Sequence, residues 1–304
     1  MVFRFIEDAA QVQALQNGDV QVIQPQATVD TVAQLEALEG QITTEEFPTL
    51  SWEHIDYNFN ENSAFSDAKG GLALREAMAL CIPRQAIVDN LIKPIQEDAV
   101  VMNAREVFPF QDDYQEIVDA AYDGRYDEVD LEAAKKKVEE SGQATPIKVR
   151  IGYKAGNQRR TETVAQIKAS CDQVGFQVED ASADDFFQNA LLAGDFEMAL
   201  YAWAGSGQIT SGQNIYASNG QQNSTKYNNP KVDEAWKALG STLDEAAQKE
   251  QVKIIEKELW DTLFGLPLYA APGVVGYDAN LQNVRPTTTQ DQVVWNASQW
   301  VAAS

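Results

Sequence analysis

Strand-like and helix-like patterns alternate through the middle of the chain, and this alternation restricts the possible folds more than any other feature. The predicted elements are a strand over residues 146–153, a helix over 161–174, a strand over 176–178, a helix over 183–193 and a strand over 196–203. A β-α-β-α-β series of this kind predicts an α/β fold, in which helices cover a sheet.

The last strand of this series, residues 196–203, is apolar on both faces, as expected of a strand buried between helices. It ends in Trp203 and is followed by a polar loop over residues 204–208. Ligands of open α/β sheets lie beyond the carboxyl ends of strands, so we expect recognition at this exit. The alternative, that Trp203 only caps a packed strand, has about equal weight.

The remaining elements are predicted from the same patterns and from turn signals. Strands are expected over residues 2–6, 20–23, 45–47, 51–59, 266–269 and 274–277. Helices are expected over residues 9–15, 29–38, 72–81, 84–92, 130–142, 233–239 and 245–263. Residues 93–126 contain two prolines and many acidic residues and are predicted to form an irregular surface excursion.

The charge balance excludes one class of partner. The formal net charge is −23, and no basic face is present to neutralise phosphates, so no nucleic acid is expected as a ligand. No apolar run approaches the roughly 18–20 residues that a membrane crossing needs. A signal peptide is also absent, which favours a cytoplasmic protein or a piece cut from a longer precursor.

The two cysteines, Cys81 and Cys171, have no second cysteine or histidine nearby in the sequence. Zinc-ligand spacing and CxxC redox chemistry are therefore absent, and no metal or cofactor is expected. Two buried thiols and one disulfide between helices both fit this pattern. The sequence leaves both open.

Catalytic machinery is not evident. His54 is the single histidine, and we expect it to be a surface or core residue rather than part of a catalytic triad. There is no GxSxG elbow, P-loop or GxGxxG motif. A pair of carboxylates for a glycosidase can always be nominated among 46 acidic residues. A binding protein therefore matches the sequence better than an enzyme does. The alternative is an extracellular, carboxylate-dependent glycoside hydrolase.

Several short motifs occur in an order that resembles a known family. They are Ala14-Leu15-Gln16-Asn17-Gly18-Asp19-Val20, Tyr57-Asn58-Phe59-Asn60, Leu74-Arg75-Glu76-Ala77, Cys81-Ile82-Pro83-Arg84, Tyr227-Asn228-Asn229-Pro230 and Leu266-Pro267-Leu268-Tyr269. Together with the strand over residues 196–203, they resemble the C-terminal portion of the family 5 solute-binding proteins of peptide ABC importers. Each motif is weak alone, and their order along nearly the whole chain carries the resemblance.

The resemblance implies a type II periplasmic-binding-protein-like α/β fold with one complete smaller lobe and part of the larger one. Residues 64–265 would form the smaller lobe, residues 1–63 part of the larger lobe, and residues 266–304 a return segment. The chain would then be an excised C-terminal portion that lacks the N-terminal half of the larger lobe. The implied hinge lies where the chain crosses between lobes, near residues 60 and 266.

The resemblance also implies a function. The protein would be the substrate-binding component of a peptide importer, not an enzyme, and would deliver an oligopeptide or related small solute to the membrane permease subunits. It would be a monomer outside the cytoplasm, either periplasmic or a cell-surface lipoprotein. The lobes would close around the solute, and the membrane subunits would distinguish this closed, loaded form from the empty one.

Five residues are the predicted ligand contacts. Trp203 is expected to act as a stacking wall, Ser206 and Gln208 as hydrogen-bonding groups, and Asn214 and Tyr216 as outer candidates. Peptide-binding members often carry an aspartate where this chain has Ser206. A neutral hydroxyl cannot make a charge-assisted bond to a peptide ammonium, which leaves a blocked peptide, a different solute or a different anchor.

Three other residues of the resemblance, Arg84, Tyr227 and Asp233, are expected to be structural. We expect them to serve as helix caps or as polar contacts inside a lobe rather than as ligand contacts.

Overall fold

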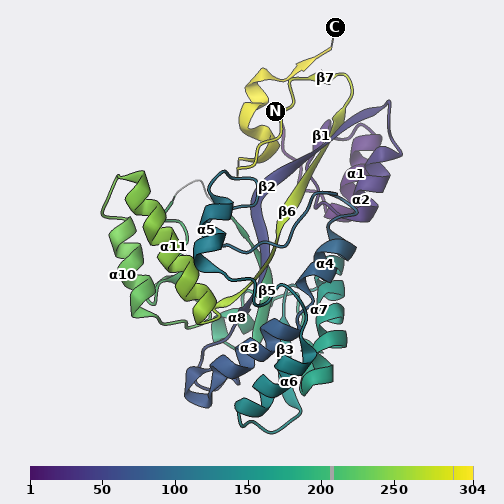
Figure 1. The fold of residues 1–304 in the computed structure, drawn as a ribbon. Helices are drawn as coiled ribbons and strands as arrows, with labels where there is room; N and C mark the ends of the chain where they lie inside the picture. Colours follow the sequence, from purple (N-terminus) through teal and green to yellow (C-terminus); the bar gives the residue numbers. More distant parts are fainter. Residues whose placement is uncertain (206–208, 290, 304) are drawn as a thin grey trace.

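Two long antiparallel strands, β2 (Ile42–Tyr57) and β6 (Gly265–Asp278), form the spine of the molecule (Figure 1). The structure is a computed structural model that describes residues 1–205, 209–289 and 291–303. Both strands run from the part of the molecule that holds the chain termini into the part that holds most of the helices.

The strands confirm the mixed α/β class. The main sheet has the order β1-β6-β2-β5-β3-β4, in which β5 is antiparallel to β2 and parallel to β3. Its shorter strands are β1 (Val22–Ile23), β3 (Ile147–Gly152), β4 (Phe176–Asp180) and β5 (Met198–Ala204). A separate small sheet pairs β7 (Leu281–Gln282) with β8 (Val301–Ala302).

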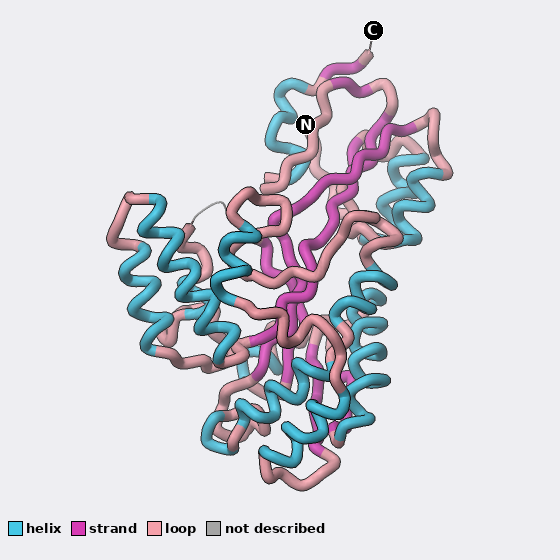
Figure 2. The backbone as a smooth tube through the Cα atoms, in the orientation of Figure 1, coloured by secondary structure: helices cyan, strands magenta, loops and turns pink. Residues whose placement is uncertain are grey.

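Helices lie along the sheet, as the tube in Figure 2 shows. They are α1 (Asp8–Gln16), α2 (Val29–Glu36), α3 (Gly71–Cys81), α4 (Arg84–Leu91), α5 (Tyr114–Ala121), α6 (Leu131–Glu140), α7 (Gln158–Cys171), α8 (Ala190–Ala193), α9 (Gln213–Tyr216), α10 (Pro230–Leu239) and α11 (Glu245–Asp261). Short 3₁₀ helices span Asp67–Lys69, Asp172–Val174 and Gln292–Gln299.

Side-chain caps explain where several helices begin. Asp130, Asn157 and Asp244 each accept a hydrogen bond from the backbone N–H three residues later, at 2.8–3.1 Å. Such a bond satisfies one of the free donors of the first helical turn. The predicted starts of α6 and α11 are therefore close to the observed ones, because the cap is a local signal.

Apolar side chains are buried at both ends of the β2–β6 pair. Examples around α1 and α2 are Leu15, Leu35 and Val274, and examples around α3 and α7 are Ile55, Leu74 and Leu200. Burying one such side chain contributes about 1.5–3 kcal/mol. The long strands therefore connect two separate clusters of buried residues.

The cysteines form a disulfide, which decides between the two options left open by the sequence. Cys81 ends α3 and Cys171 ends α7, and both residues are fully buried. The bond links two helices that pack on the same part of the sheet and closes a loop with a sequence separation of 90.

Some predicted elements are wrong or incomplete. Residues 2–6 form no strand and are mostly exposed, because they pair with no other segment in the described structure. Only Ala190–Ala193 of the predicted helix over 183–193 is helical. The preceding turn places Phe186 against the backbone of Gly152 on β3, and that packing overrides helix propensity.

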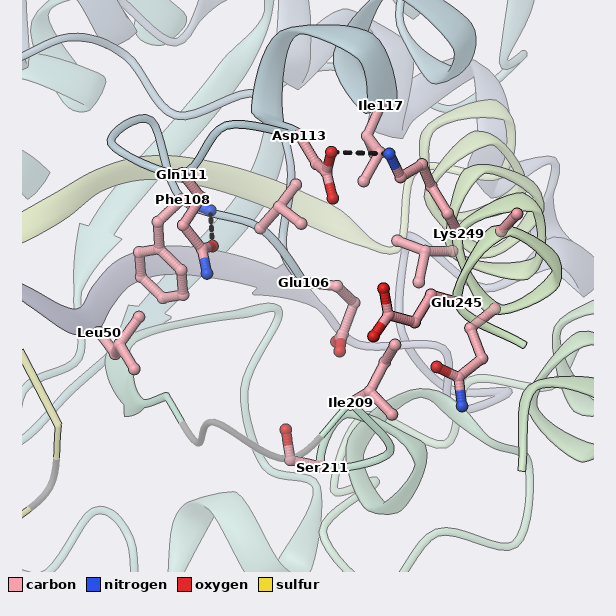
Figure 3. Close-up of a pocket in the computed structure, with 14 residues that line it drawn as sticks. Leu50, Glu106, Phe108, Gln111, Asp113, Ile117, Ile209, Ser211, Glu245 and Lys249 are labelled. Atoms are coloured by element: carbon pink, nitrogen blue, oxygen red, sulfur yellow. Dashed lines mark hydrogen bonds and ion pairs between the residues drawn. The ribbon is translucent and has the colours of Figure 1, made fainter. Parts of the chain in front are cut away.

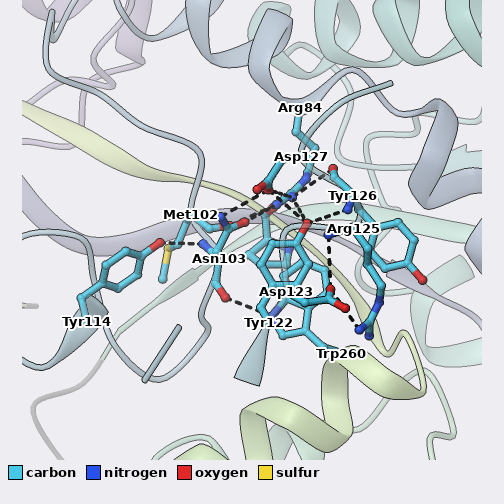
Figure 4. Close-up of polar contacts among 11 residues, drawn as sticks. Arg84, Met102, Asn103, Tyr114, Tyr122, Asp123, Arg125, Tyr126, Asp127 and Trp260 are labelled. Carbon is cyan, nitrogen blue, oxygen red and sulfur yellow. Dashed lines mark hydrogen bonds and ion pairs between the residues drawn. The ribbon is translucent and has the colours of Figure 1, made fainter. Parts of the chain in front are cut away.

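The excursion over residues 93–126 contains α5, which the sequence patterns did not predict, and Arg84 ties this segment to the sheet (Figure 4). Arg84 is 1% exposed. Its guanidinium donates to the carbonyls of Met102, Tyr126 and Pro267 and to side-chain oxygens of Asn103, Tyr122 and Asp127. Burial lowers the pKa of Arg84. The expected structural role of Arg84 is confirmed.

Tyr227 and Asp233 are structural as well. The Tyr227 hydroxyl lies 2.8 Å from the Thr262 hydroxyl, and the Asp233 carboxylate accepts a 2.8 Å hydrogen bond from the backbone N–H of Ser218. Both contacts fix the chain between β5 and α10 to its surroundings. They confirm the expectation of polar contacts inside the protein.

Candidate functional site

The exit of β5 carries a wall of aromatic side chains. Antiparallel pairing sets Trp203 opposite Trp52 and Tyr201 opposite His54, so all four side chains lie on one face of the sheet. The His54 ring stacks on Trp203 with centroids 6.1 Å apart and meets the edge of Tyr201 at 4.3 Å. Trp203 is half-buried. The wall is therefore rigid and offers part of one indole ring at its end.

Buried hydrogen bonds hold this wall in place. The Nδ1 atom of His54 lies 2.9 Å from one Asp56 oxygen, and the Tyr201 hydroxyl donates to the other at 3.0 Å. Burial and the Asp56 charge raise the pKa of Tyr201 well above its usual value. His54 is 1% exposed, which confirms it as a core residue.

Two polar atoms of the wall are left without hydrogen-bond partners among the described residues. They are the Trp203 Nε1 and the His54 Nε2, and both are buried. An unpaired buried donor such as the Trp203 N–H costs about 1–3 kcal/mol.

Two pockets flank Leu50, at the level of the β5 exit. The smaller, of about 240 Å³, lies between the end of β5 and the segment that follows β7. Its lining is Gln24, Thr49, Leu50, Ser51, Ala204, Gly205, Thr287, Thr288, Thr289 and Gln292. Gly205 donates a 2.6 Å hydrogen bond to the Leu50 carbonyl, and a Cβ at Gly205 would collide with that oxygen. Glycine is therefore required where the two strands approach.

The larger pocket, of about 700 Å³, opens on the other side of Leu50 (Figure 3). It is lined from the segment before α5, from α5 itself, from residues after the loop that follows β5, and from the start of α11. Its charged lining residues are Glu106, Asp113, Glu245 and Lys249. Its volume lies in the range of small-molecule sites.

Glu106 is the unusual group of this pocket. Figure 3 shows its carboxylate pointing into the pocket on the side of Ile209 and Ser211. Burial and the nearby charge of Glu256 raise its pKa to about 8, although Arg105 acts in the opposite direction. Glu106 therefore holds a proton at neutral pH in the empty pocket.

The pH dependence of stability should reveal this proton. A folded-state pKa of about 8 lies above the usual glutamate value of 4.5, so the folded protein loses stability as pH rises from 4.5 to 8. Glu106→Gln removes this loss. At pH 9 we therefore expect the variant to unfold at a higher urea concentration than the parent, with a free energy of unfolding larger by about 2–4 kcal/mol. The two proteins should converge near pH 5.

The matched control for this prediction is Glu132→Gln on the exposed face of α6, which should follow the parent at every pH. Urea unfolding at pH 5, 7 and 9 gives the comparison. Equal stability of Glu106→Gln and parent at pH 9 would contradict it.

The five predicted contacts have different fates. Trp203 lies at the β5 exit, and Ser206 and Gln208 lie outside the described residues. Asn214 is exposed on α9, where its carbonyl accepts a 3.0 Å bond from Gln222. Tyr216 is 1% exposed and packs edge-on against Phe264 at 5.0 Å. The structure therefore places Tyr216 in the interior.

Glu106 was missed because it lies in the segment predicted as an irregular excursion. The sequence signal that could have indicated a site here is the adjacent charged pair Arg105-Glu106, followed by a phenylalanine on each side of Pro109. In the part of the chain that the structure describes, no group of three or more His, Cys, Asp or Glu residues could hold a metal ion. Within the same residues, no helix has the length and apolarity that crossing a membrane requires.

The mixed α/β sheet places two pockets beside the exit of β5, an arrangement suited to holding a small solute. The chain belongs to the bacterial extracellular solute-binding proteins, family 5, whose middle region matches residues 1–226. This is a family of solute-binding proteins and not of enzymes, so the hydrolase alternative has no support.

Among curated relatives, an uncharacterized lipoprotein of Mycobacterium tuberculosis is 28% identical over 300 residues, covering 95% of this chain and 51% of that protein. The oligopeptide-binding protein OppA of Mycobacterium bovis is 26% identical over 298 residues, covering 96% of this chain and 49% of that protein. The chain thus spans about half the length of the curated relatives it matches.

Solved structures share the fold. The periplasmic EDTA-binding protein EppA superposes with a TM-score of 0.87 at 21% identity, covering 99% of this chain and 57% of that one. The oligopeptide-binding protein AppA of Bacillus subtilis, solved with a nonapeptide, has a TM-score of 0.79 at 17% identity, covering 98% and 59%. These confirm the periplasmic-binding-protein type II class.

Proposed function

We propose that this chain forms part of the substrate-binding component of an ABC importer for peptides and holds the solute at the exit of β5. The observation that carries the proposal is the pair of pockets beside Leu50, next to the aromatic wall that ends in Trp203. The peptide-binding names of OppA and of AppA support peptides as the solute class.

The proposed lobes are residues 64–265 and residues 1–63 with 266–304. Support comes from β2 and β6, which run together from the cluster of buried residues around α1 and α2 to the cluster around α3 and α7; the second cluster also includes Ile55 and Leu266 of these strands. Where two strands run between such clusters, a small change of backbone angles can move one lobe against the other. A solute that touches both lobes binds the closed form better and shifts the population toward it.

The proposed partners are the permease subunits in the membrane, which would receive solute from a closed monomer. The proposed location is outside the cytoplasm, in the periplasm or on the cell surface as a lipoprotein. A buried disulfide supports this location, because disulfides persist in oxidising compartments.

Calorimetric titration with a peptide library tests the proposal. We expect the longest form of the protein that its gene encodes to bind peptides of two to nine residues, with little dependence on sequence, since backbone hydrogen bonds would supply the affinity. Residues 1–304 alone should bind the same peptides far more weakly, because a one-sided site loses half of the contacts.

The controls separate the parts of this prediction. Trp203→Ala should weaken binding about tenfold, by the loss of one aromatic contact beside the pockets, whereas Trp295→Ala, on an exposed ring of the segment Gln292–Gln299, should not. Tight binding by residues 1–304 alone would contradict the two-lobe site. Binding of Fe(III)-EDTA without binding of any peptide would contradict the solute class.

A further inference from the structure

Among the described residues, no lysine or arginine forms an ion pair with the Glu106 carboxylate. Arg105, the nearest cation in sequence, donates to Glu256 at 3.2 Å and to the Gly265 carbonyl at 2.6 Å. Lys249 lies across the pocket and is paired with Asp113 at 2.7 Å and with Glu116 at 3.1 Å. No hydrogen bond or ion pair reaches the Glu106 carboxylate from any of the described residues.

The surroundings fix this carboxylate in place. The backbone N–H of Glu106 donates to Glu256 at 2.8 Å, so the start of the side chain is anchored to α11. On the other side, a Cβ at Gly212 would collide with both Glu106 oxygens, so the absent side chain of Gly212 makes room for them. The group is therefore held against the pocket wall, with no ion-pair partner among the described residues for its ionised form.

We propose that the larger pocket receives a cationic group of the solute, an α-ammonium or the side chain of lysine or arginine, with the Glu106 carboxylate as its partner. This inference rests on the proposed function and specifies the solute for the same site. Glu245, at the rim of the pocket, adds a second negative charge, and Lys249 is already neutralised. An anionic solute would meet Glu245, and Glu106 once it is ionised, and would find Lys249 already paired.

Proton linkage gives the proposal a signature beyond affinity. A cation beside Glu106 favours the ionised carboxylate, so binding releases the proton that the empty pocket holds near neutral pH. For a lysine or arginine side chain, which keeps its charge at pH 9, affinity should therefore rise with pH up to about 8 and level off above it, and it should fall approximately tenfold between pH 9 and pH 7. For an α-ammonium, whose own pKa is about 8, affinity should instead be highest near pH 8.

The test uses the longest encoded form of the protein and four alanine-based pentapeptides. The central residue is arginine or its neutral isostere citrulline, and the N-terminus is free or acetylated. Calorimetry at pH 9, 8 and 7, in buffers of different ionisation enthalpy, measures affinity and proton release. The citrulline arm reports a side-chain cation, and the acetyl arm reports the terminal ammonium.

We expect either the citrulline substitution, measured at pH 9, or the acetylation, measured at pH 8, to lower affinity by about 10-fold or more, as for hydrogen bonds between charged groups. The same peptide pair should bind with nearly equal affinity to Glu106→Gln, and proton release should vanish. Glu132→Gln on α6 should behave as the parent.

The outcomes that overturn the inference are distinct from those that overturn the proposed function. If all four peptides bound the parent equally well, the cation site would be disproved while peptide binding stood. A charge preference that persisted in Glu106→Gln would also disprove it. If no peptide bound at any of the three pH values, both proposals would fall. The comparison of charged and neutral peptides on the parent protein tests the inference by itself, even if Glu106→Gln folds poorly.

Discussion

Replacing Arg84 by methionine is expected to lower the free energy of unfolding by about 3–5 kcal/mol. The guanidinium reaches six acceptors and is almost completely buried, so its removal strands carbonyl and side-chain oxygens in the interior. Methionine fills similar volume, which makes the lost polar contacts, and not a cavity, the dominant cause.

Urea unfolding followed by far-ultraviolet circular dichroism measures this effect. The matched control is Arg125→Met. Like Arg84, Arg125 forms ion pairs, here with Asp123 and Asp261, but its side chain is 33% exposed. Exposed ion pairs contribute about 0–1 kcal/mol, so the control should stay close to the parent. A loss of less than about 1 kcal/mol for Arg84→Met would show that the network is not needed for stability.

Removal of the disulfide is expected to cost about 4 kcal/mol. The bond between Cys81 and Cys171 has a sequence separation of 90, and closing a loop of this length removes much of the entropy of the unfolded chain. The double variant Cys81→Ser, Cys171→Ser should therefore unfold at clearly lower urea than the oxidised parent. Its folded spectrum should be unchanged, because both positions only join helices that already pack together.

Reduction of the parent serves as the internal control for this result. The reduced parent and the double-serine variant should unfold at similar urea concentrations, and each single-serine variant should behave like them. If oxidised and reduced parent unfolded together, the disulfide would contribute nothing, and the packing of α3 and α7 would carry the stability of this region alone.

The predicted secondary structure was accurate where the signal is local. The helices α6 and α11 begin next to Asp130 and Asp244, whose side chains cap them, and such caps are visible in sequence. Residues 2–6 alternate like a strand but pair with nothing in the described structure. Alternation predicts a strand only where a partner strand exists, and no local pattern provides the partner.

The candidate site was predictable in part. Trp203 follows from the apolar strand that precedes it, because strand exits are where ligands bind in sheets of this class. Glu106 did not follow from any pattern. Its neighbours, Glu256 on α11 and Gly212 after β5, are more than a hundred residues away in sequence, and only folding brings the three together.

The amino-acid sequence by itself determined the α/β class, the order of most helices and strands, and membership in a solute-binding family. Periodicity, caps and short motifs are properties of neighbouring residues, which is why they can be read directly. The pairing of Cys81 with Cys171, the burial of Arg84 and the raised pKa of Glu106 were decided only by the tertiary structure. Each depends on groups that are distant in sequence, and the free energy of a buried charge depends on everything packed around it.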